Sequence, residues 1–127
     1  MNPVKKDLEI WQGKTYDVPF TFGRAIKDET GNTVDTEVTN LAGYTARMQL
    51  RPSVESETVT IELTTENGRI VIEPAYGLVR IFLTAEETAA LPVASYKYDL
   101  ELITASGRVY GPLYGKVKVK AEVTRDA

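Results

Sequence analysis

The chain has 127 residues, a formal net charge of −3, and neither cysteine nor histidine. A chain of this length forms a core large enough to fold without disulfides or a structural metal, so we expect a single domain over residues 1–127. The missing residue types exclude thiolate metal ligands and catalysis by Cys-His or Ser-His-Asp groups. The acidic balance also disfavours the phosphate backbone of nucleic acid as a partner.

The first six residues include two lysines, but no apolar stretch follows them as in a secretory leader. No segment of the sequence approaches the roughly 20 apolar residues that a membrane helix needs. We therefore expect a protein that is made in a cytoplasm and has no membrane partner.

Apolar and polar residues alternate along eight short segments, the pattern of strands with one buried and one solvated face. The eight segments are residues 8–10, 16–22, 44–50, 59–63, 70–72, 79–83, 96–102 and 117–123. Many short strands without long helices between them predict an all-β fold, either an antiparallel sandwich or a barrel.

Polar and glycine-containing segments predict the turns between these strands. Gln12–Lys14 and Ala105–Arg108 are each expected to close a hairpin. The same is expected of Glu66–Arg69, because its Asn-Gly pair tolerates the positive φ angles of tight hairpin turns. Residues 27–32 are predicted to form a polar turn, and residues 36–42 a loop.

Two prolines mark places where the backbone departs from this pattern. Pro19 lies within a strand pattern and cannot donate to a ladder, so it predicts an edge strand or a bulge. Pro92 ends a segment that begins with Thr84 and has Glu87 three residues later, the spacing of a capping box. This segment predicts one or two helical turns that connect two strands.

Asp99 and Glu101 lie two residues apart on the polar side of a predicted strand. Paired carboxylates can hydrolyse glycosides, but a solvated strand face accounts for this pattern more simply. Lys116, Lys118 and Lys120 share one face of the last predicted strand, where we expect them to pair with these carboxylates across the sheet. We predict no catalytic, metal-binding or cofactor-binding residues, and hence no enzyme.

Three aromatic residues are candidates for a protein–protein interface: Trp11, Tyr110 and Tyr114. Trp11 is out of phase with Leu8 and Ile10, so it points to the opposite face of its strand. There it either packs over a neighbouring hairpin or acts as an exposed anchor, a role in which tryptophan is enriched. Tyr110 and Tyr114 belong to an irregular stretch, which is either a bulge or a contact patch for a neighbouring subunit.

Four segments carry motifs that occur together in one group of proteins. They are Asp7–Gly13 (DLEIWQG), Leu41–Arg51 (LAGYTARMQLR), Leu83–Pro92 (LTAEETAALP) and Tyr96–Leu102 (YKYDLEL). In this order the motifs resemble those of small virion structural proteins of tailed bacteriophages, and the chain is similar to the immunoglobulin-like N-terminal domain of phage upper baseplate proteins. The resemblance implies an antiparallel immunoglobulin-like β-sandwich of about eight strands with one short connecting helix.

The resemblance also implies a role as a non-enzymatic structural protein of the phage virion, made in the cytoplasm of the bacterial host. Such a protein docks at the baseplate, the tail-fibre attachment or the head–tail region. Its partners are then other phage structural proteins and further copies of itself, with neither nucleic acid nor membrane involved. Two alternatives stay open: a capsid decoration protein, and a carbohydrate-binding surface module that uses Trp11 and Tyr110 or Tyr114 as sugar platforms.

Overall fold

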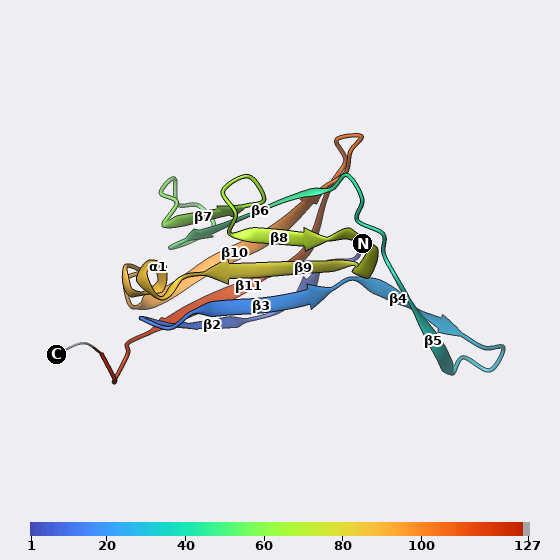
Figure 1. Ribbon diagram of the computed structural model, residues 1–127, viewed down its shortest axis with the longest axis horizontal. Helices are drawn as coiled ribbons and strands as arrows, with labels where there is room; N and C mark the ends of the chain where they lie inside the picture. Colours follow the sequence, from blue (N-terminus) through green and yellow to red (C-terminus); the bar gives the residue numbers. More distant parts are fainter. Residues whose placement is uncertain (126–127) are drawn as a thin grey trace.

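The computed structural model of the chain describes residues 1–125, which form eleven β-strands, one short α-helix and one 3-10 helix. Two sheets pack face to face, and a separate two-stranded hairpin extends away from them at one end (Figure 1). The all-β class that the alternation predicts is therefore confirmed.

The larger sheet has six strands in the order β1-β11-β10-β6-β7, with β2 also paired to β11. Its strands are β1 (Val4–Lys5), β2 (Leu8–Trp11), β6 (Thr45–Arg51), β7 (Ile61–Thr64), β10 (Ala94–Ile103) and β11 (Val109–Lys120). Both β1 and β2 run parallel to β11, so the sheet is mixed and not antiparallel as predicted. The alternation cannot reveal this direction, because parallel and antiparallel strands both place successive side chains on opposite faces.

The smaller sheet has three antiparallel strands in the order β3-β9-β8. They are β3 (Tyr16–Thr21), β8 (Ile70–Glu73) and β9 (Leu78–Leu83), with the 3-10 helix η1 (Pro74–Tyr76) between β8 and β9. Because β3 pairs only with β9, the edge position predicted from Pro19 is confirmed. The remaining pair, β4 (Gly23–Lys27) and β5 (Thr33–Val38), forms the separate hairpin, which we call the arm.

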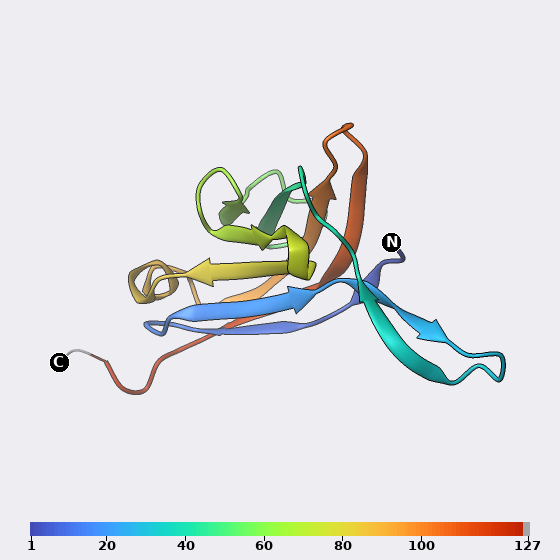
Figure 2. The same cartoon turned by 45° about the vertical axis from the view of Figure 1, so that its right-hand side comes forward.

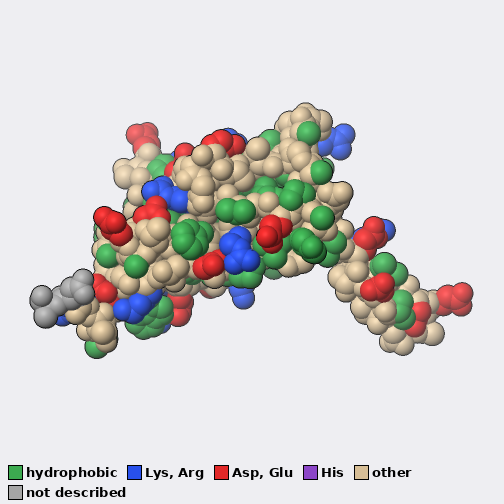
Figure 3. Space-filling view, viewed as in Figure 1, with side chains coloured by type: hydrophobic (Ala, Val, Ile, Leu, Met, Phe, Trp, Pro, Cys, Tyr) green, Lys and Arg blue, Asp and Glu red, His purple; other side chains and the backbone are tan. Residues whose placement is uncertain are grey.

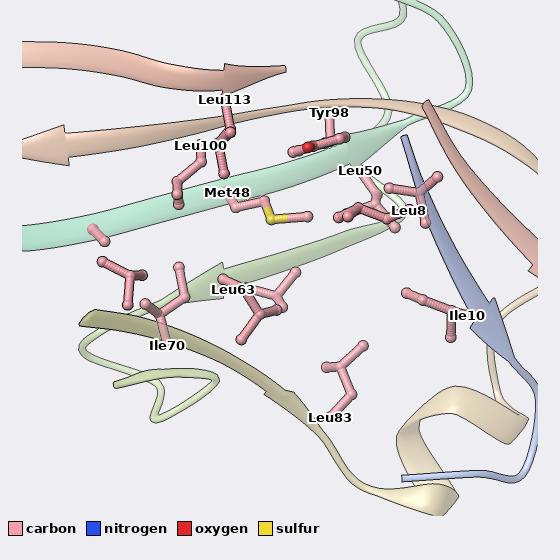
Figure 4. Close-up of a cluster of buried hydrophobic side chains, with 14 of the residues drawn as sticks. Leu8, Ile10, Met48, Leu50, Leu63, Ile70, Leu83, Tyr98, Leu100 and Leu113 are labelled. Atoms are coloured by element: carbon pink, nitrogen blue, oxygen red, sulfur yellow. The ribbon is translucent and has the colours of Figure 1, made fainter. Parts of the chain in front are cut away.

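The core lies between the inner faces of the two sheets (Figure 4). Leu50 and Leu100 from the larger sheet and Ile70 and Leu83 from the smaller one are at most 1% exposed. These residues all fall on the apolar phase of the alternation that predicts the strands. Burial of one such side chain stabilises the fold by roughly 1.5–3 kcal/mol, so these inner faces hold the two sheets together.

The helix α1 (Ala85–Ala89) confirms the predicted capping box. The Glu87 backbone N–H donates to the Thr84 hydroxyl at 3.1 Å, and the Thr84 N–H donates to the Glu87 carboxylate at 2.9 Å. The buried hydroxyl of Thr88 then donates to the Lys14 carbonyl at 2.8 Å, which ties the helix to the turn between β2 and β3. The helix thus connects β9 in the smaller sheet to β10 in the larger one.

Two of the three predicted hairpins are wrong. The Gln12–Lys14 turn joins β2 of the larger sheet to β3 of the smaller one, and Glu66–Arg69 joins β7 to β8, again between sheets. Only Ala105–Arg108 closes a hairpin, between β10 and β11. A tight turn has the same local chemistry whether the next strand pairs with the last one or crosses to the other sheet.

All eight predicted segments contain strands, but three further strands exist within residues 1–125, namely β1, β4 and β5. The predicted turn at residues 27–32 is the tip of the arm, whereas β5 occupies part of the predicted loop at residues 36–42. The last strand also begins earlier than predicted and ends at Lys120, which leaves Val123 outside it and 88% exposed.

Two tyrosine hydroxyls anchor β10 to other parts of the chain. Tyr96 donates to the Pro92 carbonyl at 2.7 Å, four residues upstream at the corner after α1. Tyr98 donates to the Lys6 carbonyl at 2.6 Å, between β1 and β2. Burial raises the pKa of both phenols, so both remain protonated donors at neutral pH.

Candidate docking surfaces

The arm is the part of the structure that contacts the sandwich least. Every residue from 23 to 38 is exposed, whereas the strands of both sheets, apart from the two-residue β1, have more buried and more exposed positions in turn. In two views the arm extends away from both sheets (Figures 1 and 2). A two-stranded hairpin with no third layer is only marginally stable in water, so the arm depends on local interactions.

Side-chain chemistry at the tip and along the arm supplies these local interactions. The Asp28 carboxylate accepts hydrogen bonds from the Thr30 hydroxyl at 2.7 Å and from the Asn32 backbone N–H at 3.0 Å. These bonds hold the pKa of Asp28 below its usual value. Nearer the sandwich, Arg24 and Glu37 form an exposed ion pair at 2.8 Å across the two strands. The turn is therefore preformed without a core.

The base of the arm is fixed to the smaller sheet by backbone contacts. The Phe22 N–H donates to the Gly77 carbonyl at 2.8 Å, and the Thr39 N–H donates to the Phe22 carbonyl at 2.9 Å. Gly77 has a φ of 59°, and a Cβ there would lie 2.6 Å from the Phe22 carbonyl oxygen. Only glycine fits this close approach, so the direction in which the arm leaves the sandwich is set by the fold.

Trp11 and Tyr114 both lie on the outer face of the larger sheet, as the interpretation of Trp11 as an outward residue predicts. Each is 46% exposed. The Lys120 ammonium lies 5.1 Å from the centroid of the Trp11 ring, a cation–π contact that covers part of the indole. Trp11 pairs with Lys120 in the register and Tyr114 lies six residues earlier on β11, so roughly 20 Å of strand separates the two aromatics.

Tyr110 does not belong to the same surface. It is half-buried and pairs with Leu102, a core residue, so it points toward the inner side of the sheet. Between Tyr110 and Leu113 the register with β10 shifts, which confirms the predicted bulge. The three aromatic residues predicted to form an interface therefore do not lie together in the structure.

The expected pairing of the β11 lysines with the carboxylates of β10 is wrong. Asp99 lies opposite Tyr114, and Lys116 lies opposite Lys97. Lys118 lies opposite Ser95, so the lysines fall beyond the two carboxylates along β10. The alternation gives the face of each residue but not the register, which decides its partner across the sheet. Glu101 pairs instead with Arg47 on β6.

A hollow of about 550 Å³ opens on the outer face of the larger sheet, over β6, β10 and β11. Four basic residues line it, namely Lys5, Arg51, Lys97 and Lys116, together with the carboxylate of Asp99. Partial burial raises the pKa of Asp99, with a smaller contribution from the neighbouring negative charge of Glu101. The hollow is therefore a positively charged depression on an acidic protein.

The floor of the hollow is rigid because the segment between β1 and β2 is fixed where it passes β11. A Cβ at Gly115 would lie 2.7 Å from the Lys6 carbonyl oxygen, so this crossing requires glycine. The Lys116 N–H donates to the Asp7 carboxylate at 3.0 Å, and this bond lowers the pKa of Asp7. Together with the Tyr98 hydroxyl, these contacts hold Lys5 at the rim of the hollow.

The outer face of the smaller sheet is a third exposed surface (Figure 3). At its centre Arg80 pairs with Asp17 at 2.9 Å, and Val71 on β8 is 46% exposed. Half-buried Leu78 and Phe82 lie on β9, on the same face as Arg80. Hydrophobic and charged side chains are mixed on this face, without the charge of one sign that distinguishes the hollow.

Within residues 1–125, no group of three or more acidic, histidine or cysteine side chains has the geometry of a metal site. No helix in the same range has the length and hydrophobicity to cross a membrane. No model of a known protein family matches the chain, and no curated protein sequence is significantly similar to it.

Sequence reasoning missed both the arm and the hollow. The arm lacks the alternation of buried strands, and its one sequence signal is the Asp28-to-Asn32 turn between two short β-compatible runs. The hollow draws its basic residues from four separate segments, which only the sheet order brings together.

Proposed function

We propose that the chain is a non-enzymatic structural protein of a tailed-phage virion that works by docking to other virion proteins. The proposal extends to the region that the motifs imply: the baseplate, the tail-fibre attachment or the head–tail junction. Its partners are then other structural proteins of the particle and further copies of the chain, and its place is the virion after synthesis in the host cytoplasm.

The arm is the observation that carries this proposal. Residues 23–38 are all exposed and contribute nothing to the core, yet the base of the arm is held in a fixed direction by Gly77 and Phe22. Both strands of the arm offer free backbone donors and acceptors along their outer edges, which is how strand addition to a partner begins. The arm adds no buried residue to the core, and its base holds it in a direction away from both sheets. Contact with a partner explains such an arm best.

An immunoglobulin-like architecture is part of the same proposal. The strand order β2-β11-β10-β6-β7 opposite β3-β9-β8, with a first strand parallel to the last, supports it. The hydrogen bond from Tyr96 to the Pro92 carbonyl at the corner before β10 has the geometry of a tyrosine corner. In this interpretation β1, β4 and β5 are additions to an eight-strand sandwich.

The aromatic arrangement gives little support to a carbohydrate-binding module. Trp11 and Tyr114 lie roughly 20 Å apart along β11, and Tyr110 points to the inner side of the sheet. Stacking of one sugar ring needs an exposed aromatic face, but the ring of Trp11 is already in contact with the Lys120 ammonium. Docking to protein remains the function that the surface supports best.

The test is the content and labelling of purified particles of the phage that encodes the chain. We expect the chain in the mass spectrum of the particles, and immunogold label at the tail tip or neck. Label over the head would point instead to capsid decoration. Absence of the chain from intact particles, by both methods, would refute the virion role.

A glycan array provides the control for the alternative class of function. An assembly protein should give no reproducible binding, and a Trp11→Ala variant should not change that result. Specific binding that Trp11→Ala abolishes would overturn the docking proposal in favour of a carbohydrate-binding module.

A further inference from the structure

The arm and the hollow have opposite charge. The arm carries a net charge of −2, from four acidic and two basic residues: Asp28, Glu29, Asp35, Glu37, Arg24 and Lys27. Acidic side chains are visible along its exposed length in Figure 3. The hollow carries four basic side chains and one carboxylate, Asp99. Opposite charges on two surfaces steer their association and help to decide which surfaces meet.

The arm cannot reach the hollow of its own chain. Its base is fixed by the hydrogen bonds of Phe22 and Thr39, and in both views the arm extends away from the sandwich (Figures 1 and 2). The hollow lies on the outer face of the larger sheet, whereas the arm continues from β3 of the smaller sheet. A complementary contact between them must therefore be made between two copies.

We propose that the arm of one copy docks in the basic hollow of a second copy. This inference rests on the proposed assembly role and names one of its partners, the chain itself. In the contact, Glu29 and Asp35 of the arm face the ammonium groups of Lys97 and Lys116. Glu37 stays paired with Arg24, and Asp28 stays in its turn.

Two different surfaces meet in this contact, so it is a head-to-tail interface. A pair of copies still has one unoccupied arm and one unoccupied hollow, so further copies can add until the assembly closes into a ring or continues as a filament. Because the contact is made by exposed charges, it weakens as salt shortens the distance over which they act, to about 8 Å at physiological ionic strength.

A charge swap tests the inference directly. One variant, Glu29→Lys with Asp35→Lys, changes the net charge of the arm from −2 to +2. The other, Lys97→Glu with Lys116→Glu, reverses the hollow. The last two residues lie opposite each other in the register, so this change replaces one like-charge pair with another.

Sedimentation velocity at low salt should show self-association of the unmodified chain. Each double variant alone should associate roughly tenfold more weakly or worse, since like charges then meet at the interface. An equal mixture of the two variants should recover the association, because the acidic arm then finds a basic hollow and the basic arm an acidic one. Two single charge reversals outside both surfaces, Glu86→Lys and Arg108→Glu, serve as controls and should leave self-association unchanged.

Three results would overturn the inference. The first is an unmodified chain that stays monomeric at low salt and millimolar concentration. The second is a double variant that associates as tightly as the unmodified chain. The third is a mixture of the two variants that does not recover the association. Circular dichroism and thermal melting first establish that each variant is folded, so that a loss of association is not caused by unfolding. The proposed function is tested separately. If the chain is found in the virion but does not self-associate, this inference is refuted and the proposed function is not.

Discussion

The sandwich and the arm hold their strands together by different means. In the sandwich, two inner faces of buried side chains such as Leu50 and Leu83 press the sheets together. In the arm, the hydrogen bonds of the Asp28 turn and the exposed Arg24–Glu37 ion pair hold the two strands together without any buried residue. Exposed ion pairs are worth only about 0–1 kcal/mol, so the arm is the weaker structure.

This difference separates folding from binding within one short chain. Changes in the sandwich alter the free energy of unfolding, whereas changes in the arm alter what the protein contacts. A mutation in one region is therefore expected to leave the property of the other region nearly intact. The predictions below test that separation, from the largest expected effect to the smallest.

Two valines give the sharpest contrast. Val79 in β9 is 0% exposed, and Val34 in the arm is 62% exposed. Val79→Ala should lower the free energy of unfolding by about 2–3 kcal/mol, because it removes two buried carbons and leaves a cavity. Val34→Ala should change it by less than about 0.5 kcal/mol. Urea denaturation measures both, and equal losses would mean that the arm folds as part of the core.

Two glycines share a positive φ but differ in their surroundings. Gly77 at the base of the arm has φ +59° with backbone oxygens close to its missing Cβ, and Gly31 at the tip has φ +88° with no atom within 4 Å. Gly77→Ala should destabilise the fold by about 1–3 kcal/mol more than Gly31→Ala, since only the first adds a clash to the strained backbone. Thermal melts of the two variants compare them. Equal melting temperatures would show that the base is not held tightly.

Two carboxylates with lowered pKa give a pH-dependent comparison. The backbone N–H of Thr84 and the side chain of Arg69 lower the pKa of Glu87, so its stabilising effect is full above its unfolded pKa near 4.5 and is lost as pH falls through the folded value. Glu87→Gln can keep the capping box but removes the charge beside Arg69 and at the start of the helix, so it should cost up to about 1 kcal/mol at pH 7, and this difference should vanish in acid.

Asp28→Asn is the matched change in the arm, where Thr30 and Asn32 lower the pKa of the carboxylate. It should leave the global unfolding midpoint unchanged at every pH, because the turn of the arm is not coupled to the core. Urea midpoints from pH 3 to pH 7 compare the two variants. A pH-dependent loss in Asp28→Asn would contradict the separation of the two regions.

Removal of the whole arm should also have little effect on stability. A chain in which residues 24–37 are replaced by an Asn-Gly turn keeps Gly23, Val38 and the base contacts of Phe22 and Thr39. We expect its melting temperature to stay within about 3 °C of the full chain, because none of residues 23–38 belongs to the buried core. Calorimetry measures this, and a large drop would show that the arm stabilises the sandwich.

The sequence predicts the sandwich well for the same reason that it misses the arm. A strand with one buried face must alternate polar and apolar residues, so Tyr16–Thr21 and Ala94–Ile103 are both visible in the sequence. Residues 23–38 bury neither face and carry no such pattern. The phase of alternation also predicts the outward direction of Trp11 correctly, because it depends only on neighbours in the same strand.

Features that depend on which strands become neighbours could not be predicted. The Gln12–Lys14 and Glu66–Arg69 turns have hairpin-like residues, yet the strands on either side of each turn belong to different sheets. The hollow needs Lys5 beside Lys116, and these residues meet only because β1 pairs with the far end of the chain. Local chemistry determines turns and faces, whereas the burial of the whole core determines the partners.

The parallel pairing of β2 with β11 gives the molecule a direction of mechanical strength. Leu8 pairs with Val117 and Trp11 with Lys120, so tension between the start of β2 and the end of β11 acts along both strands. Such a load shears the evenly spaced ladder bonds together, whereas tension across the β10–β11 hairpin opens its bonds one after another. In single-molecule pulling we expect a higher unfolding force in the first geometry, and equal forces would show that the β2–β11 ladder carries no special load.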